Sequence, residues 1–142
     1  MRALLDVNVL IALLDSDHVS HGKTTSWFSQ NALKGWASCP LTQNGCVRIM
    51  STPSYPNPLP AQAVIRRLKE ACEAEVHEFW QDEVSVLDSA VIDSTKIHGP
   101  RQLTGIYLLA LAVKRGGCFV TFDAHIPLAA VRNAHTRHLV VL

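Results

Sequence analysis

Two aspartates occupy equivalent places in the sequence, each at the end of a short apolar run. Asp6 ends the segment 2–6, and Asp123 follows the segment 118–122. Runs of this length are typical of buried strands, so we expect both carboxylates at the carboxyl ends of strands. If those strands are neighbours, the two acids meet in one crevice. They cannot both stay ionised there at low cost unless a cation neutralises them.

Carboxylate oxygens favour Mg²⁺ or Mn²⁺ as the cation. Such an ion lowers the pKa of a bound water and stabilises the charge that develops on a phosphate during cleavage. We therefore predict metal-binding and catalytic roles for Asp6 and Asp123. For a single acid an ordinary helix cap is the better interpretation, because aspartate is among the commonest N-cap residues. The repetition of the pattern favours a metal site.

The residues around these acids leave other interpretations open. Asn8 and Thr121 either support the metal site or are ordinary turn residues. A phosphatase that uses Asp6 as its nucleophile fits less well, because Asn8 stands where such an enzyme is expected to carry a second aspartate.

The elements that would position the acids alternate along the chain. Short apolar segments predict strands at 2–6, 35–39, 84–87, 118–122 and 139–142. Apolar residues at helical spacing and capping residues predict helices at 8–14, 18–33, 42–50, 61–76, 89–97 and 104–115. This alternation predicts one three-layer α/β/α domain over residues 1–142, with a mostly parallel central sheet of about five short strands. Ligands of such sheets bind outside the carboxyl ends of the strands.

The composition is globular and limits the kinds of partner. Hydrophobic residues make up 48% of the 142 residues and charged residues 18%, and the formal net charge is +1, so nucleic acid needs a local basic patch. The four cysteines form no CxxC pair, which argues against a zinc knuckle and for a reducing compartment. No uncharged run reaches the roughly 18 residues that span a bilayer. We expect a cytoplasmic protein without a membrane partner.

Several blocks of the sequence resemble those of a known family. They are the segments 6–13 (DVNVLIAL), 39–50 (CPLTQNGCVRIM), 102–112 (QLTGIYLLALA) and 116–123 (GGCFVTFD). In this order, and over essentially the whole chain, they resemble PIN-domain proteins of the VapC type. Each block alone has little specificity, and their combination is what carries the resemblance.

The resemblance implies a PIN fold and a Mg²⁺-dependent endoribonuclease that cleaves RNA phosphodiester bonds with metal-activated water. It also implies a toxin that pairs with a VapB-like antitoxin and forms a homodimer. The residues that the resemblance adds as supports of the metal site are Thr42, Gln43 and Thr104.

Two positions depart from the family's pattern. The family's ring of acids comes from four places in the chain, and Asp6 and Asp123 match two of them. An acid is common where this chain has Gln43, and an aspartate is usual where it has Gly105. A cation held by two carboxylates and waters binds more weakly than one held by more acids. The alternative function is therefore a catalytically impaired PIN domain that binds RNA or an antitoxin.

Five basic residues near the closing blocks are candidates for holding an RNA backbone. They are Lys96, His98, Arg101, Lys114 and Arg115. A solvated helix face explains them nearly as well, and the basic pair at 114–115 also suits the negative end of a helix.

Overall fold

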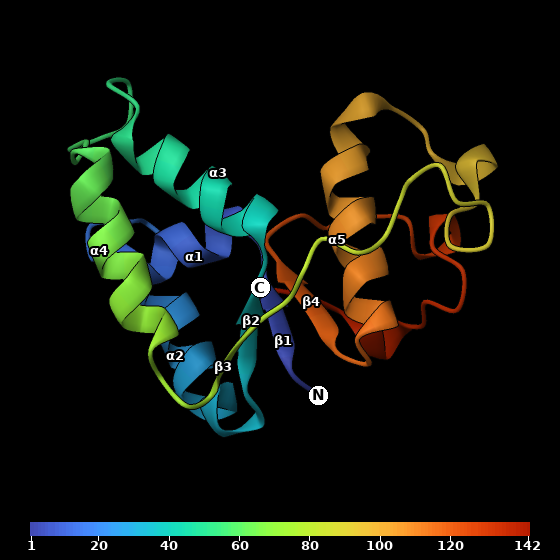
Figure 1. Cartoon of the computed structure of the whole chain (residues 1–142), viewed down its shortest axis with the longest axis horizontal. Helices are drawn as coiled ribbons and strands as arrows, with labels where there is room; N and C mark the ends of the chain where they lie inside the picture. The colour runs from blue at the N-terminus through green and yellow to red at the C-terminus, as the bar shows by residue number, and fades with distance from the viewer.

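Five short parallel strands form the centre of the structure, in the order β3-β2-β1-β4-β5 (Figure 1). The computed structural model describes residues 1–142. The strands are β1 (Ala3–Leu5), β2 (Trp36–Ser38), β3 (His77–Phe79), β4 (Cys118–Thr121) and β5 (Leu139–Val141). β1 pairs with β2 on one side and with β4 on the other, where Leu5 lies opposite Val120. The two strands that precede Asp6 and Asp123 are therefore neighbours, as the metal-site prediction requires.

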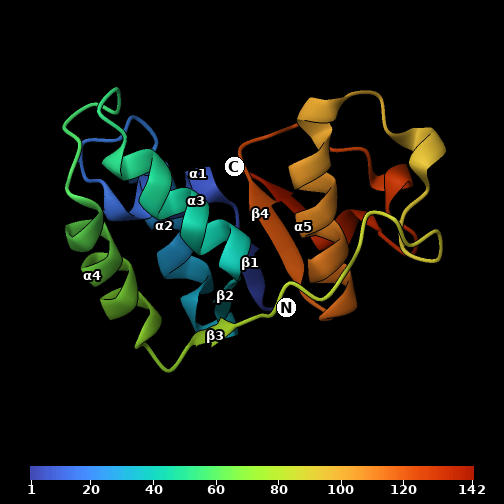
Figure 2. The same ribbon diagram turned by 45° about the horizontal axis from the view of Figure 1, so that its top comes forward.

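Five α-helices cover the two faces of this sheet. They are α1 (Val7–Leu14), α2 (His21–Asn31), α3 (Pro40–Ser51), α4 (Ala61–Cys72) and α5 (Leu103–Lys114). Figures 1 and 2 show α5 on one face and the other four helices on the opposite face. Side chains of β1 alternate between two apolar cores: Leu4 belongs to the core that includes Leu109 of α5, and Leu5 belongs to the core that includes Leu10 of α1. The predicted α/β fold with a parallel sheet is confirmed. None of the helices combines the length and the apolar character that a bilayer crossing requires.

The connection between α5 and β4 positions the beginning of α5. The helix ends at Lys114, and Gly116 follows with a φ of 68°, in the left-handed region that glycine adopts at little cost. β4 begins two residues later. Because this turn is tight, α5 and β4 run in opposite directions, and the first turn of α5 lies beside the carboxyl end of β4.

The predicted strand 84–87 is wrong. This segment is irregular and largely exposed, and the Leu87 side chain is 90% exposed. The remaining strand is instead β3, whose side chains are half-buried or exposed. An edge strand pairs through its backbone with one neighbour only, here β2. Its sequence therefore needs no apolar run, and none marks it.

The predicted helix 89–97 is also wrong. The region contains only a 3-10 turn over Ser94–Lys96. The carboxylates of Asp88 and Asp93 each accept a hydrogen bond from the backbone N–H two residues further on. Such local turns satisfy backbone groups and compete with a helix.

Two other helices are shorter than predicted. The helix predicted at 18–33 begins at His21, because the ring of His18 accepts a hydrogen bond from the backbone N–H of Ser20 and holds a turn there. The helix predicted at 61–76 ends at Cys72, and the chain turns directly into β3.

Candidate active site

A cavity of about 510 Å³ lies at the carboxyl ends of β1 and β4. It is flanked by α3 and α5, which Figures 1 and 2 show on either side of these two strands. Asp6 follows β1 directly, Asp123 comes two residues after β4, and both line the cavity. The parallel sheet thus brings together two acids that are far apart in the sequence.

Asp6 is fixed by hydrogen bonds to both carboxylate oxygens. Its Oδ1 accepts from the backbone N–H of Val7 at 2.8 Å, and its Oδ2 accepts from Oγ1 of Thr121 at 2.6 Å. Asp6 is therefore the N-cap of α1, as the structural interpretation of this residue predicts. A carboxylate offers about four lone-pair sites, so these two bonds leave capacity for a ligand.

Thr121 connects the two acids. It is fully buried, and its Oγ1, which donates to Asp6, also accepts a hydrogen bond from the backbone N–H of Asp123 at 3.1 Å. One hydroxyl group therefore sets the position of the Asp6 carboxylate and of the Asp123 backbone at the same time.

The charge state of Asp6 depends on what neutralises it. Burial raises the pKa of its carboxyl group above the usual 3.8, the hydrogen bonds from Thr121 and Val7 lower the pKa, and the charge of Asp123 raises it again. The net effect is a raised pKa. A cation in the cavity would offset the burial and the repulsion, because it favours the ionised form.

Asp123 reaches the cavity from its rim. Its side chain is 44% exposed, and its Oδ1 accepts a hydrogen bond from the backbone N–H of His125 at 2.8 Å. The ring Nδ1 of His125 lies 3.6 Å from the same oxygen. Asp123 thus has the exposure that a ligand for a hydrated ion needs.

Asn8 and Thr104 also line the cavity, as does Gly105. A Cβ atom at position 105 would lie 2.8 Å from Cδ1 and 3.0 Å from Cγ1 of Ile126. An acid at this position would therefore require Ile126 to move. The space of the missing side chain is occupied by a neighbouring apolar side chain.

Gln43 lies outside the cavity of the two acids. Its Nε2 donates a hydrogen bond to Oγ of Ser38 at 2.9 Å, and the same Oγ lies 2.8 Å from Nε2 of His77. Gln43 lines a separate cavity of about 690 Å³ between α3 and α4. The structure therefore does not bring this residue to Asp6 and Asp123.

Thr42 has a structural position. It is fully buried, its Oγ1 accepts from the backbone N–H of Cys39 at 3.0 Å, and it donates to the carbonyl of Cys39 at 3.1 Å. The helix predicted at 42–50 begins two residues earlier, at Pro40, and Cys39 is its N-cap. Thr42 holds the start of α3 without lining the cavity.

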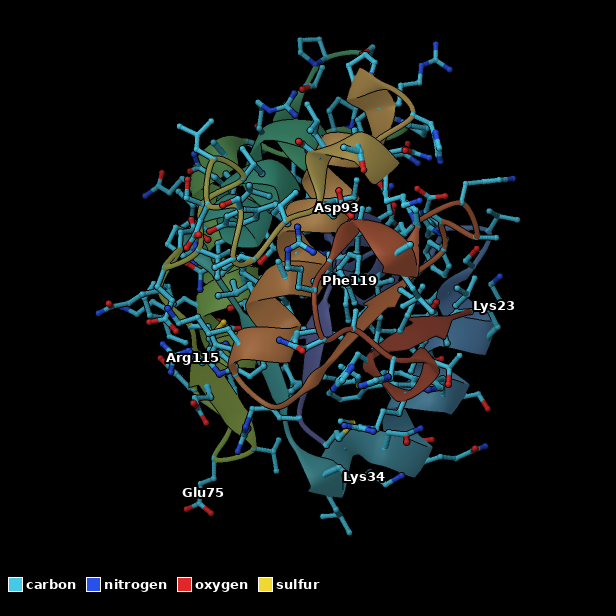
Figure 3. All side chains as sticks on the ribbon, turned by 90° about the vertical axis from the view of Figure 1, so that its right-hand side faces the viewer. Lys23, Lys34, Glu75, Asp93, Arg115 and Phe119 are labelled. Atoms are coloured by element: carbon cyan, nitrogen blue, oxygen red, sulfur yellow. The ribbon has the colours of Figure 1, made fainter.

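The basic residues divide into two groups. Arg101 lines the cavity, and Lys96 and His98 do not. Lys114 and Arg115 are at the opposite end of α5, where Lys114 donates to the carbonyl of Glu83 and Arg115 pairs with its carboxylate at 2.5 Å. Figure 3 shows Arg115 beside the lower end of α5. These two residues are too far from the acids to hold the same phosphate.

The sequence prediction missed two polar residues of the cavity, Asn44 and Arg48, both on α3. They are four residues apart, which places them on one face of a helix. Leu41, three residues before Asn44, lines the cavity too. This helical spacing was the signal that could have revealed them.

The donors present fit a hydrated Mg²⁺ ion. Asp6, Asp123, Asn8 and Thr104 line the cavity and carry carboxylate, amide and hydroxyl oxygens. No group of three or more His, Cys, Asp or Glu side chains comes together anywhere in the structure. Mg²⁺ is commonly held by one or two carboxylates while it keeps several waters. The donor set therefore suits Mg²⁺ with a largely aqueous shell and does not suit zinc.

Known proteins provide independent evidence of kinship. No protein-family model matches the chain. Ribonuclease VapC44 of Mycobacterium tuberculosis (strain H37Rv) is 53% identical over 142 residues, which is the full length of both chains. Ribonuclease VapC38 of the same strain is 43% identical over 135 residues, with 94% of each chain covered. Ribonuclease VapC39 is 41% identical over 125 residues, which cover 87% of this chain and 90% of the relative.

A solved structure supports the fold. The crystal structure of VapBC2 from Rickettsia felis, bound to a DNA fragment from their promoter, contains a chain that matches with a TM-score of 0.58 and 12% identity. The match covers 100% of this chain and 98% of that one. At this identity the likeness establishes the fold, and the mycobacterial relatives establish the family. The chain belongs to the VapC family of ribonucleases.

Proposed function

We propose that the chain is a Mg²⁺-dependent endoribonuclease, the toxin of a toxin–antitoxin pair. The observation that carries this proposal is the meeting of Asp6 and Asp123 in one cavity, joined through Thr121. The names of the relatives support the ribonuclease activity, and the two carboxylates that line one cavity support the metal.

In this proposal the chain's own residues position the ligands and hold the charge. Asp6 and Asp123 would bind the ion, with Asn8 and Thr104 beside them. When bound, Mg²⁺ supplies an activated water and stabilises the charge on the phosphate. The hydrogen bonds from Val7 and Thr121 keep the Asp6 carboxylate in one orientation. Because the pKa of Asp6 is raised, protons compete with the ion, so metal affinity should increase as the pH rises through that pKa.

The cleavage of a labelled RNA in Mg²⁺ or Mn²⁺ tests this function. Asp6→Asn and Asp123→Asn should each lower the rate at least about 100-fold, since each removes a charge that the reaction needs. Asparagine caps helices nearly as well as aspartate, so Asp6→Asn should remain folded. Asp17→Asn, an exposed acid outside the cavity, is the matched control. Equal rates for the native chain and Asp6→Asn would exclude the mechanism.

The second candidate function is a binding module without efficient catalysis. Gly105 and Gln43 favour it, because neither position contributes a ligand to the cavity. Such a chain would bind RNA or an antitoxin and cleave slowly or not at all. A native chain that cleaves at the rate of a variant with a restored acid would exclude this function.

We also propose a VapB-like antitoxin as a partner, and a homodimer. The solved neighbour is a complex of VapB and VapC. An apolar groove of about 350 Å³ between α1, α2 and α4 offers a surface for such a partner, with Leu13 and Phe28 among its lining side chains. Sedimentation should give twice the mass of one chain, and Leu13→Lys should weaken inhibition by a VapB-type antitoxin. A monomeric mass, or undiminished inhibition of Leu13→Lys, would contradict the corresponding part.

A further inference from the structure

Two arginines from different elements reach the cavity of Asp6 and Asp123. Arg48 comes from α3, and Arg101 comes from the 3-10 turn Pro100–Gln102 that leads into α5. We propose that Arg48 and Arg101 form a clamp that binds a phosphate of the RNA backbone without any metal ion. Because the ligand is the RNA of the proposed function, this clamp deepens that function and can be tested separately from cleavage.

Both guanidinium groups are free to take a ligand. Arg48 and Arg101 are exposed, and neither guanidinium belongs to any of the ion pairs within the chain. Neither Asp6 nor Asp123 forms an ion pair with these arginines. By contrast, Arg2 pairs with Glu78, and Arg115 pairs with Glu83.

Position 105 offers Arg101 no acidic partner, because it is a glycine. Arg101 lies in the 3-10 turn that leads into α5, and Gly105 lies in the first turn of that helix. Gly105 supplies no carboxylate there, and Ile126 fills the space. The same departure that weakens the metal site therefore leaves a cation available on the rim of the cavity.

The charge of the cavity lining permits an anion to enter. Its charged side chains are two carboxylates and two guanidinium groups. These charges balance, whereas a cavity with four acids would repel a phosphate until a cation bound. A guanidinium group presents parallel N–H donors that match two phosphate oxygens. Two of them on different sides of one cavity can hold one phosphodiester group.

Binding of a fluorescein-labelled single-stranded RNA in EDTA tests the clamp, with anisotropy as the readout. The native chain should bind, and Arg48→Ala and Arg101→Ala should each weaken binding roughly tenfold. Each loss should also reduce the slope of log affinity against log salt by about 0.7, the value for one phosphate contact on a single strand. Arg48→Lys should recover part of the affinity, because it keeps the charge without the paired donors.

Arg66→Ala is the matched control, since Arg66 is an exposed arginine of α4 outside the cavity. It should change neither the affinity nor the slope. Asp6→Asn should tighten binding in EDTA, because it removes a charge that repels the phosphate.

Three results would overturn the clamp: no binding of the native chain in EDTA, unchanged binding by Arg48→Ala and Arg101→Ala, or an equal loss in Arg66→Ala. Cleavage in Mg²⁺ is measured separately. A chain that binds through these arginines but does not cleave would refute the nuclease and leave the clamp intact. If the native chain cleaves RNA and the arginine variants bind RNA as tightly as the native chain, the clamp is refuted and the nuclease function stands.

Discussion

The strand ends and the helix starts around the cavity differ in what they contribute. At the ends of β1 and β4, Asp6 and Asp123 are present and are fixed through Thr121. At the starts of α3 and α5, Gln43 is drawn towards Ser38 and Gly105 packs against Ile126. The acids absent from the helix starts are therefore not simple deletions. Each replacement has its own packing or hydrogen bond, so restoring an acid requires more than one substitution.

Thr121→Val should have the largest effect on stability, because it breaks the connection between the two strand-end acids. Valine keeps the shape but leaves the backbone N–H of Asp123 without its acceptor and Oδ2 of Asp6 without its donor. We expect the free energy of unfolding to fall by about 2–4 kcal/mol and RNA cleavage to fall at least about tenfold. Urea unfolding and the cleavage assay measure the two effects.

Thr25→Val is the control for Thr121→Val, since the Thr25 hydroxyl bonds only to backbone carbonyls of its own helix. It should cost less than about 1 kcal/mol. If Thr121→Val cost no more than this control, the shared hydroxyl would have no special role.

The contact of Gly105 with Ile126 at the start of α5 is tested by a double-mutant cycle of substitutions at these two residues. Gly105→Asp alone should destabilise the fold by about 1–3 kcal/mol through overpacking. Ile126→Val removes the Cδ1 atom that lies 2.8 Å from the new Cβ position. The double variant should therefore be more stable than the sum of the single changes by about 1 kcal/mol, and its Mn²⁺ affinity should rise at least about tenfold. Strict additivity in urea unfolding would argue against the steric coupling.

Two adjacent residues of α3, Gln43 and Asn44, should differ in their effect on metal binding. Asn44 lines the cavity of the two acids, whereas Gln43 does not. Asn44→Asp should strengthen Mn²⁺ binding several-fold in calorimetry. Gln43→Glu should leave Mn²⁺ binding unchanged and cost about 1 kcal/mol, because its hydrogen bond to Ser38 is lost. The opposite pattern would show that Gln43 turns into the cavity in solution.

The smallest expected effect is a pH dependence of the stability that His77, the neighbour of Ser38, contributes to the fold. Burial lowers the pKa of His77 below its usual 6.5, so the unfolded chain binds a proton more readily than the folded one. Stability from this group is therefore lost as the pH falls through 6.5 towards the lowered pKa, and it does not change further below that pKa. The stability difference between the native chain and His77→Gln should shrink between pH 7.5 and pH 5. A constant difference would contradict this prediction.

Much of the fold follows from local patterns. Four of the five strands and the helices α1, α3, α4 and α5 coincide with apolar runs or periodicities in the sequence. β3 escapes such reasoning, because an edge strand is held by backbone pairing to β2 and not by apolar side chains. The helix prediction for 89–97 is wrong because the Asp88 and Asp93 carboxylates stabilise turns that a helical pattern does not reveal.

The sequence predicts the part of the candidate site that lies at strand ends. It does not predict the residues whose orientation depends on partners distant in the sequence. The convergence of Asp6 and Asp123 follows from the pattern of two apolar runs that each end in an acid. The orientation of Gln43 does not follow from the sequence pattern, because its partner Ser38 and the neighbouring His77 come from two different strands. The availability of Arg48 depends on the packing of α3 beside the sheet, which no local pattern specifies.

The central position of β1 in the sheet affects whether the site stays formed during local unfolding of the protein. The backbone N–H of Asp6 donates to the carbonyl of Val120 at 2.9 Å, within the middle of the sheet. Interior strands exchange their amide hydrogens last, whereas edge strands such as β3 open at a small fraction of the global unfolding energy. The chain can therefore fray at β3, and lose the contact of His77 with Ser38, while both strand-end carboxylates stay in register.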